Sequence, residues 1–501
     1  MLTTLAVCLF SITQIFTQTI NNNIPKHRRE MRGLWVSVIA NIDWPTVNGL
    51  SVSDLQNEAT VILDRAAAMG LNSIFLQVRP SCDVIYPSKI EPYSEYLASN
   101  NFTNVDSLNN FDALKFWVDE AHHRGIELHA WINPFRVTPM PDYPCDTAHL
   151  SRKHPEWTIK FSEKLYLDPG IPKARAHVLS VIDEIITNYD VDGIHFDDYF
   201  YPYPAENEVF CDTASYRLYN PNRLPKDEWR RSNVDSVIYN VNALIKSKKP
   251  WMAFGISPFG VWRNNNKDKR GSATRAGVTD YDDLSADVLK WIEERWVDYV
   301  VPQLYWEAGN RRADFDILQH WWSAQSTPQT RIFVGHALYR INCGSTAWKN
   351  VEEMPQQIAK VRADEGVDGS VFFSYRQFNR DLYDLESQMR NNIYSKTSLV
   401  PLVLDGEDVE LQIDNISHTG TKIRWSLDGD RDNVRFYVVY RYKKSEQFDP
   451  SDPQFIYAVT DSEEIIAERR GGEDGRYVFR VAPIDKWRRE HKLSRRVIIH
   501  Y

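Results

Sequence analysis

The chain repeats one structural unit, and its clearest copy ends in the stretch Asp192-Gly193-Ile194-His195-Phe196-Asp197-Asp198-Tyr199-Phe200-Tyr201-Pro202. A helical pattern over residues 178–189 precedes it, and the apolar run then ends in two carboxylates and an aromatic loop. A short apolar run after a helix predicts a buried strand. Because alternate side chains of a strand share a face, we expect His195 and Asp197 on one face and Asp198 on the other.

The same unit of amphipathic helix, turn and short apolar strand recurs from about residue 32 to residue 391. Gly70, Gly125 and Gly366 stand where the C-terminus of a helix favours a positive φ angle. Apolar strands that alternate with helices predict a parallel sheet covered by helices. The pattern gives eight strands, over residues 33–39, 73–78, 126–131, 193–197, 253–257, 299–305, 332–338 and 370–374.

Eight such units in one domain predict an α/β fold of the (β/α)8 TIM-barrel type over residues 29–395. The alternative is a doubly wound open sheet, but no Gly-rich phosphate-binding fingerprint supports it. After about residue 396 apolar and polar residues alternate, and turns rich in Gly, Asp and Asn separate the runs. This alternation with intervening turns predicts a small antiparallel β-sandwich over residues 402–501.

The N-terminal residues 1–19 are predicted to be a signal peptide, because residues 2–16 are mostly apolar and a polar and then a basic run follow. The apolar run is short for a membrane span, although an uncleaved anchor is the alternative. We therefore expect a secreted or periplasmic protein with no membrane span after signal removal. The net charge of −9 and the pI of about 5.9 argue against a general affinity for nucleic acid or anionic membranes.

The cysteines beyond this segment are Cys82, Cys145, Cys211 and Cys343, and they show neither CxxC nor Cys/His metal spacing. Disulfides and free buried thiols are both open alternatives for them. No metal or other cofactor is expected, apart from a structural Ca²⁺ that acidic loops could hold.

Polar and aromatic side chains recur near the C-terminal ends of most predicted strands. Each has an ordinary explanation in packing or hydrogen bonding, but a barrel directs them all to one mouth, where the active sites of this fold lie. The residues expected to bind substrate there are Asp43, Trp44, Arg79, Trp131, Asn133, His195, Tyr199, Trp262, Arg263, Gln303, Tyr305, His336 and Tyr375.

Carboxylates beside aromatic residues predict carbohydrate chemistry, since glycoside hydrolysis needs one carboxyl group as acid and another as nucleophile or base. Asp197 and Glu307 are the expected catalytic pair, because strand alternation puts both on the inward face. Glu307, in the more apolar setting, is expected to be the acid, and Asp197 the ionised partner. The alternatives are an arginine partner role for Asp197 and substrate binding alone for Glu307. Asp198 is a third catalytic candidate, which alternation turns away from the lumen.

Several segments together resemble the bacterial glycosyl hydrolase-like ten family over residues 29–391. They are Arg32-Gly33-Leu34-Trp35-Val36, Asn41-Ile42-Asp43-Trp44-Pro45, Gln77-Val78-Arg79-Pro80, Trp131-Ile132-Asn133-Pro134, the stretch 193–202, Gly255-Ile256-Ser257-Pro258-Phe259-Gly260-Val261-Trp262-Arg263, Thr274-Arg275-Ala276-Gly277, Tyr281-Asp282-Asp283-Leu284 and Pro302-Gln303-Leu304-Tyr305-Trp306.

The resemblance implies an exported (β/α)8 glycosidase, distantly related to the α-amylase superfamily, whose substrates include peptidoglycan glycan strands stripped of their peptides. In the α-amylase pattern Gly-x-Arg-x-Asp carries the nucleophile, which supports Asp197, although His195 stands in place of the Arg. That pattern also puts an acidic Glu after strand 5, and none is present here, so Glu307 is the substitute. The C-terminal domain resembles a fibronectin type III module.

The sequence therefore predicts a glycoside hydrolase that cleaves a glycan by a two-carboxylate mechanism. A glycan-binding protein on a barrel that has lost activity is the first alternative, favoured by the missing strand 5 glutamate. A metal-dependent hydrolase that uses His195, Asp197, Asp198 and His336 is the second, but no HxH pair on strand 1 supports it.

Overall fold

The computed structural model describes residues 27–98, 108, 111–402, 406–469 and 474–501. The predicted signal peptide lies outside the described residues. Among the helices of the described part, none is both long and apolar enough to cross a membrane.

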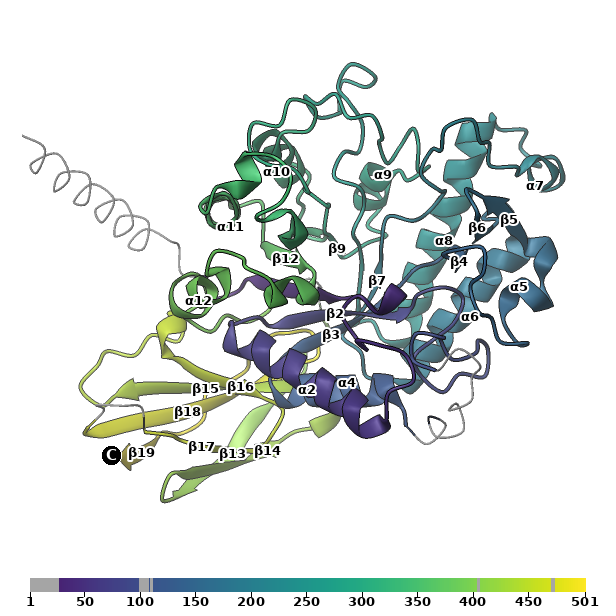
Figure 1. The fold of residues 1–501 in the computed structure, drawn as a ribbon. Coiled ribbons are helices and arrows are strands. Elements are labelled where there is room, and N and C mark those ends of the chain that lie inside the picture. Colours follow the sequence, from purple (N-terminus) through teal and green to yellow (C-terminus); the bar gives the residue numbers. More distant parts are fainter. Residues whose placement is uncertain (1–26, 99–107, 109–110, 403–405, 470–473) are drawn as a thin grey trace, which may run out of the picture.

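The centre of the molecule is a parallel sheet that closes into a barrel (Figure 1). Its strands are β1 (Met31–Val36), β2 (Ser73–Arg79), β3 (Glu127–Ile132), β7 (Gly193–Phe196), β8 (Ala253–Ile256), β9 (Tyr299–Val300), β10 (Arg331–Ile332), β11 (Val334–Ala337) and β12 (Gly369–Phe373). The order is β10-β9-β8-β7-β3-β2-β1-β12-β11. Only Phe333 separates β10 from β11, so both ends of this order belong to one stretch of chain. The eight predicted strands and the TIM-barrel fold are confirmed.

Helices cover the outside of the barrel, as Figure 1 shows. The longer ones are α2 (Val52–Ala68), α4 (Ala113–His123), α6 (Pro172–Asn188), α8 (Lys226–Lys248), α10 (Phe315–Ser323) and α11 (Glu353–Ala363). In α2, Ser51 caps the first turn by accepting from the Asp54 amide, and Leu55, Ile62 and Leu63 are buried at helical spacing. Gly70 then turns the chain with φ +75°, where a Cβ would lie 2.6 Å from the Tyr394 carbonyl.

The lumen of the barrel is filled by side chains and is not a pore. Trp35, Phe75, Tyr299, Phe333 and Val371 pack there as a separate apolar cluster inside the strands. Val400, from the segment that leaves the barrel, joins this cluster at its lower end, which contains the N-terminal ends of the strands. The space that is open to solvent is therefore confined to the opposite end of the barrel.

The loop after β3 contains secondary structure that the sequence did not predict. Strands β4 (Arg136–Thr138), β5 (Thr158–Phe161) and β6 (Lys164–Leu167) form a small antiparallel sheet in the order β4-β6-β5. The short helix α5 (Leu150–Lys153) lies between β4 and β5 in the chain. This sheet forms one wall of the barrel mouth.

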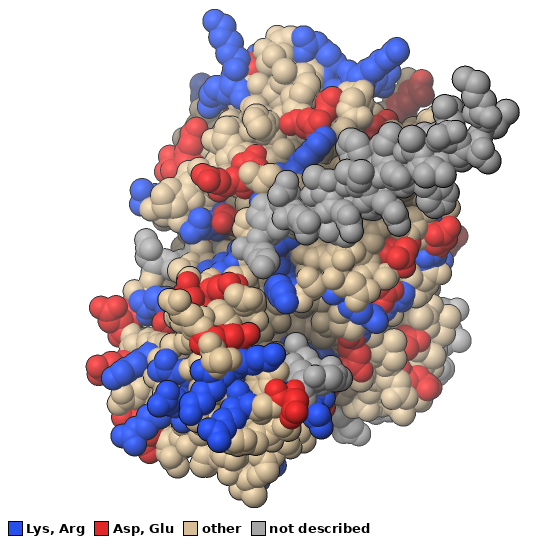
Figure 2. Space-filling view, turned by 90° about the vertical axis from the view of Figure 1, so that its left-hand side faces the viewer, with Lys and Arg blue, Asp and Glu red and all other residues tan. Residues whose placement is uncertain are grey.

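The C-terminal region forms two antiparallel sheets that pack on each other, as predicted. One contains β13 (Gln412–Thr419), β14 (Lys422–Asp428) and β17 (Glu464–Ile466). The other contains β16 (Ile456–Thr460), β15 (Val434–Lys443), β18 (Arg476–Asp485) and β19 (Val497–His500). Figure 2 shows acidic and basic side chains over the whole of one face, with basic side chains gathered on its lower part, where Figure 1 places the sandwich.

The sandwich docks against the N-terminal ends of the barrel strands, and β15 is buried on both of its faces. Tyr437 and Val439 point into the sandwich core, whereas Val438 and Tyr440 belong to a cluster that includes Leu399 of the linker. At Gly125, before β3, an added Cβ would lie 2.5 Å from the Val459 carbonyl of β16. The backbone of the sandwich therefore lies directly against the barrel.

The cysteines Cys82, Cys145, Cys211 and Cys343 are all free thiols. Cys82 is buried and accepts a hydrogen bond from the Arg79 guanidinium at 3.0 Å. Of the two alternatives for these residues, the structure therefore has the free thiols.

Candidate active site

A cavity of about 490 Å³ opens at the C-terminal ends of the barrel strands. Its floor and walls come from strand ends, from the loops after them and from the β4-β6-β5 sheet. The lining residues include Trp35, Trp131, Arg136, Lys164, Tyr166, Asp197, Asp198, Tyr199, Tyr203, Ser257, Phe259, Gln303, Tyr305, Trp306, Tyr339 and Arg340. Two carboxylates and an aromatic surround make this the candidate active site.

Asp197 lies just beyond the end of β7 and is held by N–H donors on both oxygens. The Trp131 indole donates to Oδ2 at 3.1 Å, the Asn133 amide donates to Oδ2 at 2.9 Å, and the Tyr199 backbone amide donates to Oδ1 at 3.2 Å. Burial raises the pKa of Asp197, while the nearby Arg136 guanidinium and these donors oppose the rise. The donors orient the carboxylate and favour its ionised form.

Asp198 also lines the cavity, although strand alternation predicts the opposite direction. The strand β7 ends at Phe196, so the alternating pattern no longer applies at Asp198. Tyr203 donates its hydroxyl to the Asp198 carboxylate, and the Gln303 side chain bonds to it as well. Burial and then the charge of Asp197 raise the pKa of Asp198 to about 6. A carboxyl group in this state can carry a proton near neutral pH.

A third buried carboxyl, Asp280, lies close behind Asp198. It accepts the Phe259 amide at 3.0 Å on Oδ1, and its Oδ2 has no hydrogen-bond partner among the described residues. Burial and the charge of Asp198 keep the pKa of Asp280 well above its ordinary value. The negative charge of Asp198 therefore favours the protonated form of Asp280. No sequence pattern pointed to Asp280, which stands in the long loop after β8.

Aromatic rings form the sides of the cavity. Tyr199 stacks under the Arg136 guanidinium at 4.4 Å, and Tyr305 meets Tyr339 edge-on at 5.8 Å. Flat apolar faces with polar groups at their edges suit the alternating CH and OH surfaces of a sugar ring. The arrangement therefore fits a carbohydrate.

The structure brings seven of the predicted residues to this site. Asp197, Asp198, Trp131, Tyr199, Gln303 and Tyr305 line the cavity, and Asn133 supports Asp197 from behind. Trp131 and Asn133 stand at the end of β3, and Asp197 and Asp198 directly follow β7. A position at the end of a barrel strand is the signal by which the sequence identified them.

Glu307, the predicted acid, does not line the cavity. Its carboxylate accepts the Trp348 indole N–H at 3.1 Å, and its backbone carbonyl accepts from Asn310 in a turn. The predicted strand over 299–305 contains only Tyr299 and Val300 in the ladder, so the alternation that assigned Glu307 to the lumen ends well before it. The pairing of Asp197 with Glu307 therefore has no geometric basis.

His195 and His336 lie in the core below the mouth, and neither lines the cavity. His195 is fully buried under the floor, between Tyr299, Ser257 and Trp35. His336 is hydrogen-bonded to Gln357 and Ser370 in the outer layer. Among the described residues, no group of three His, Cys, Asp or Glu side chains is arranged to hold a metal ion.

Arg79 points away from the lumen because the pairing of β2 with β3 shifts by one residue between Gln77 and Arg79. It is fully buried in an ion pair with Glu91.

Five further predicted residues also make structural contacts outside the cavity lining. Asp43 caps the β1 turn, Trp44 packs on Trp117, and Tyr375 contacts Arg65. Trp262 donates to Asp287, and Arg263 pairs with Asp282.

Several lining residues were not predicted. Lys164 and Tyr166 come from the unpredicted β4-β6-β5 sheet, and Tyr203 and Phe259 come from loops with no periodic pattern. The aromatic run after Asp198 was a signal for Tyr203, since it continues past Tyr201 to Pro202 and Tyr203.

Residues 30–351 of the chain match the family described as glycosyl hydrolase-like 10. The glycosyl hydrolase YngK of Bacillus subtilis is 35% identical over 489 residues, which cover 93% of each chain. The glycosyl hydrolase DigH of Escherichia coli K12 is 34% identical over 375 residues, which cover 70% of this chain and 84% of DigH. The glycoside hydrolase domain of PgaB from Bordetella bronchiseptica is 12% identical, with a TM-score of 0.46 over 72% of this chain and 99% of that domain.

Proposed function

Because the chain belongs to the glycosyl hydrolase-like 10 family, we propose that it is a glycoside hydrolase whose catalytic carboxyl groups are Asp197 and Asp198. The observation that supports this is the pair of buried carboxyl groups in one aromatic-walled cavity at the barrel mouth. No ion pair among the described residues involves either group, although the Arg136 guanidinium lies near Asp197. Such groups are costly to bury and are concentrated at functional sites.

The surroundings of the two groups assign different roles to them. Asp198, with a pKa raised to about 6, donates a proton to the glycosidic oxygen of the leaving sugar. Asp197, held by the N–H groups of Trp131, Asn133 and Tyr199, serves as the ionised group that acts on the anomeric centre or on the attacking water. The configuration of the first product, followed by NMR, distinguishes a nucleophile from a base.

We propose an amino-sugar glycan as the substrate, with peptide-free peptidoglycan strands as the first member of that class to test. This substrate rests on the family resemblance. The aromatic walls of the cavity support a sugar backbone as the part of the ligand that they contact. We also propose residues 29–395 as the catalytic domain, 402–501 as a fibronectin type III-like domain, and export directed by residues 1–19.

The experiment measures the release of reducing ends from peptide-free peptidoglycan strands by the wild type, Asp197→Asn and Asp198→Asn. Each substitution keeps the shape of the side chain, and we expect kcat to fall about 10³-fold in each variant. Glu307→Gln is the matched control, because its carboxylate bonds to Trp348 outside the cavity. It is expected to keep kcat within about twofold.

Two outcomes contradict the proposal. Binding of the glycan by the wild type without any release of reducing ends supports the alternative of a glycan-binding protein. Loss of activity in Glu307→Gln with retention in Asp198→Asn returns the acid role to Glu307.

A further inference from the structure

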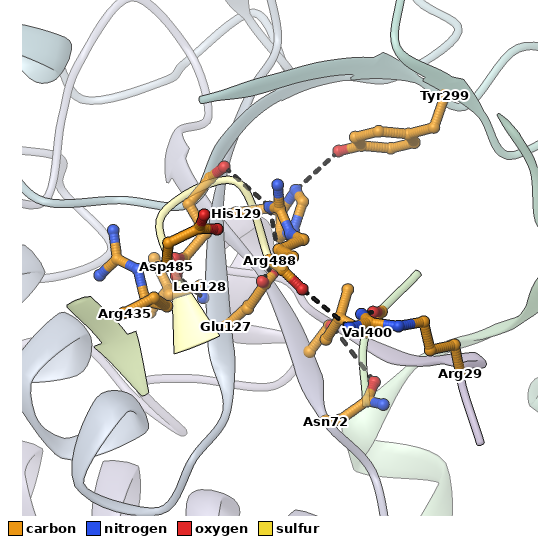
Figure 3. A network of polar contacts seen from close by, with 12 residues as sticks. Arg29, Asn72, Glu127, Leu128, His129, Tyr299, Val400, Arg435, Asp485 and Arg488 are labelled. Carbon is orange, nitrogen blue, oxygen red and sulfur yellow. Dashed lines mark hydrogen bonds and ion pairs between the residues drawn. The ribbon is translucent and has the colours of Figure 1, made fainter. Parts of the chain in front are cut away.

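A chain of buried polar side chains runs through the lumen from the sandwich to the floor of the cavity. Figure 3 shows its first part, from Arg488 through Glu127 and His129 to Tyr299. It begins at Arg488, whose Nε and Nη2 donate to Glu127 at 2.7 and 2.9 Å. Glu127 contacts His129 Nε2 at 3.4 Å, and His129 Nδ1 lies 2.8 Å from the Tyr299 hydroxyl. That hydroxyl lies 3.2 Å from His195 Nδ1.

The upper end of the chain reaches the groups that line the cavity. His195 Nε2 lies 3.0 Å from the Ser257 hydroxyl and 3.3 Å from the Trp35 indole nitrogen. Both of these residues line the cavity. The Ser257 carbonyl in turn accepts the Gln303 side-chain amide at 3.0 Å, and Gln303 bonds to Asp198.

When both histidines are neutral, the chemistry of the two end groups fixes the direction of every hydrogen bond in the chain. An indole N–H can only donate, so Trp35 leaves His195 Nε2 as an acceptor and places the His195 proton on Nδ1. Nδ1–H then donates to Tyr299, whose hydroxyl donates to His129 Nδ1. The His129 proton therefore lies on Nε2 and is donated to the Glu127 carboxylate, which can only accept.

Arg488 keeps Glu127 in the state that this direction requires. Burial alone would raise the pKa of Glu127, but the charge of Arg488 and the hydrogen bonds from His129 and Arg488 together hold it below its ordinary value. A protonated Glu127 would itself be a donor, and His129 could then adopt the other tautomer. The ionised state of Glu127 thus determines the tautomer of the first histidine in the chain.

The turn that carries Arg488 is built to insert it. Arg488 has a φ angle of +67°, which is rare for a residue with a side chain, and its side chain is buried. The Asp485 carboxylate braces the turn by accepting the Arg489 amide at 2.8 Å. Arg29, from the segment before β1, donates to the Arg488 carbonyl at 2.8 Å. Contacts from both the sandwich and the barrel therefore hold the turn in place.

We propose that Arg488 of the C-terminal sandwich is a positioning residue for the active site, which acts through Glu127, His129, Tyr299 and His195 on the floor of the cavity. The assignment rests on the proposed function, because it concerns the same cavity. It gives the sandwich a part in the reaction without any contact to substrate: the sandwich fixes the hydrogen-bond direction under Ser257 and Trp35.

The main variant is the double substitution Arg488→Met with Glu127→Gln. Arg488→Met alone leaves a buried charge and can unfold the protein, whereas removing both partners of a buried pair is often close to neutral for stability. A glutamine at position 127 can either donate to or accept from His129, so the direction of the chain is lost. We expect kcat on the glycan to fall about tenfold while KM stays within about twofold.

Arg28→Met is the matched control. Arg28 also joins the barrel to the sandwich, through Glu490 and Tyr440, but it takes no part in the lumen chain. We expect it to keep wild-type kcat. An equal fall of kcat in Arg28→Met and in the double variant overturns the proposal, because the loss then reflects docking of the sandwich alone.

A second measurement is independent of activity. In protein with ¹⁵N-labelled histidine, the ring nitrogen shifts report the tautomers, and His129→Asn and His195→Asn assign the signals. We expect wild type and Arg28→Met to show His195 protonated on Nδ1 and His129 on Nε2, and the double variant to show a mixture at His129.

The two measurements separate failure of this proposal from failure of the proposed function. Wild-type shifts in the double variant overturn the lumen chain, whether or not the protein hydrolyses a glycan. Altered shifts with an unchanged kcat overturn the positioning role. If the wild type releases no reducing ends, the proposed function fails, and the positioning role of Arg488 fails with it, while the shifts still decide whether the chain exists.

Discussion

The two ends of the barrel both bury carboxylates, and the pair at the N-terminal end has arginine partners that the pair at the mouth lacks. At the N-terminal end Glu127 and Asp192 pair with Arg488 and Arg435 at 2.7 and 2.9 Å, and these arginines together with neighbouring histidines hold the pKa of each carboxyl below its ordinary value. At the C-terminal mouth Asp198 has no ion pair among the described residues, and burial raises its pKa to about 6.

The presence or absence of an arginine partner distinguishes structural carboxylates from chemically available ones within one fold. A buried carboxylate such as Glu127 or Asp192 joins the barrel to the sandwich through its arginine partner, and the ion pair compensates its charge. A buried carboxyl without such a partner costs stability and is available to exchange a proton with a ligand. For these four carboxyl groups the sign of the pKa shift therefore distinguishes the two candidate catalytic groups from the two that join the domains.

The largest expected effect tests the N-terminal end. Asp192→Asn removes the partner of the buried Arg435, so the free energy of unfolding should fall by about 3 kcal/mol at pH 7. Asp190→Asn is the control, because Asp190 bonds to the same arginine but is 49% exposed, and its loss should cost less than about 1 kcal/mol. Chemical denaturation measures both values, and equal values would remove the distinction between buried and exposed partners.

The second prediction concerns the pH dependence of kcat, which reports the protonation of Asp198 at the barrel mouth. Asp198 must hold a proton to act as an acid, and its raised pKa means that the proton is lost as the pH rises through about 6. We therefore expect kcat to fall about 50-fold between pH 6 and pH 8, about fivefold over the first unit and about tenfold over the second. Glu307→Gln should show the same limb, and a flat profile of kcat over this range contradicts the role of Asp198.

The third prediction is a gain in the free energy of unfolding, whereas Asp192→Asn is expected to lower it. A carboxyl whose pKa is raised on folding adds stability below its unfolded pKa and loses that stability as the pH rises through the folded pKa. Asp198→Asn removes this loss, so the variant should be more stable than wild type by on the order of 2 kcal/mol at pH 7. The gain should vanish near pH 4. Thermal melts at both pH values measure it, and a variant less stable at pH 7 would show that Asp198 is a structural carboxylate.

The smallest effect concerns the support of Asp197. Trp131→Phe keeps the ring but removes the N–H that donates to Oδ2, so we expect kcat to fall about tenfold. Trp262→Phe removes an indole N–H that donates to Asp287 outside the cavity, and it should leave kcat unchanged. A similar fall of kcat in both variants would point to a general loss of packing.

The fold was predictable because the repeat of helix and apolar strand extends along the whole barrel. The predictions failed where a residue lies beyond the regular part of its strand. Alternation placed Glu307 in the lumen, but β9 ends at Val300, and a register shift turns Arg79 outward. Asp198 enters the cavity for the same reason, since β7 ends two residues earlier.

The contact between the domains was not predictable from local pattern. Arg488 and Glu127 are 361 residues apart in the chain, and each occurs in an ordinary local sequence. The small sheet of β4, β5 and β6 was missed because its strands have three or four residues, too few to show alternation. Long-range ion pairs and very short strands become visible only when the chain is folded.

The ion pairs between the barrel and the sandwich have a consequence for the evolution of the gene. A recombination event that removed the sandwich would leave Glu127 and Asp192 without their arginine partners. Single-domain descendants should therefore carry neutral residues at these two positions, and acidic residues there should covary with the arginines equivalent to Arg488 and Arg435. The residues at positions 127 and 192 of the barrel thus indicate whether a related protein carries the sandwich.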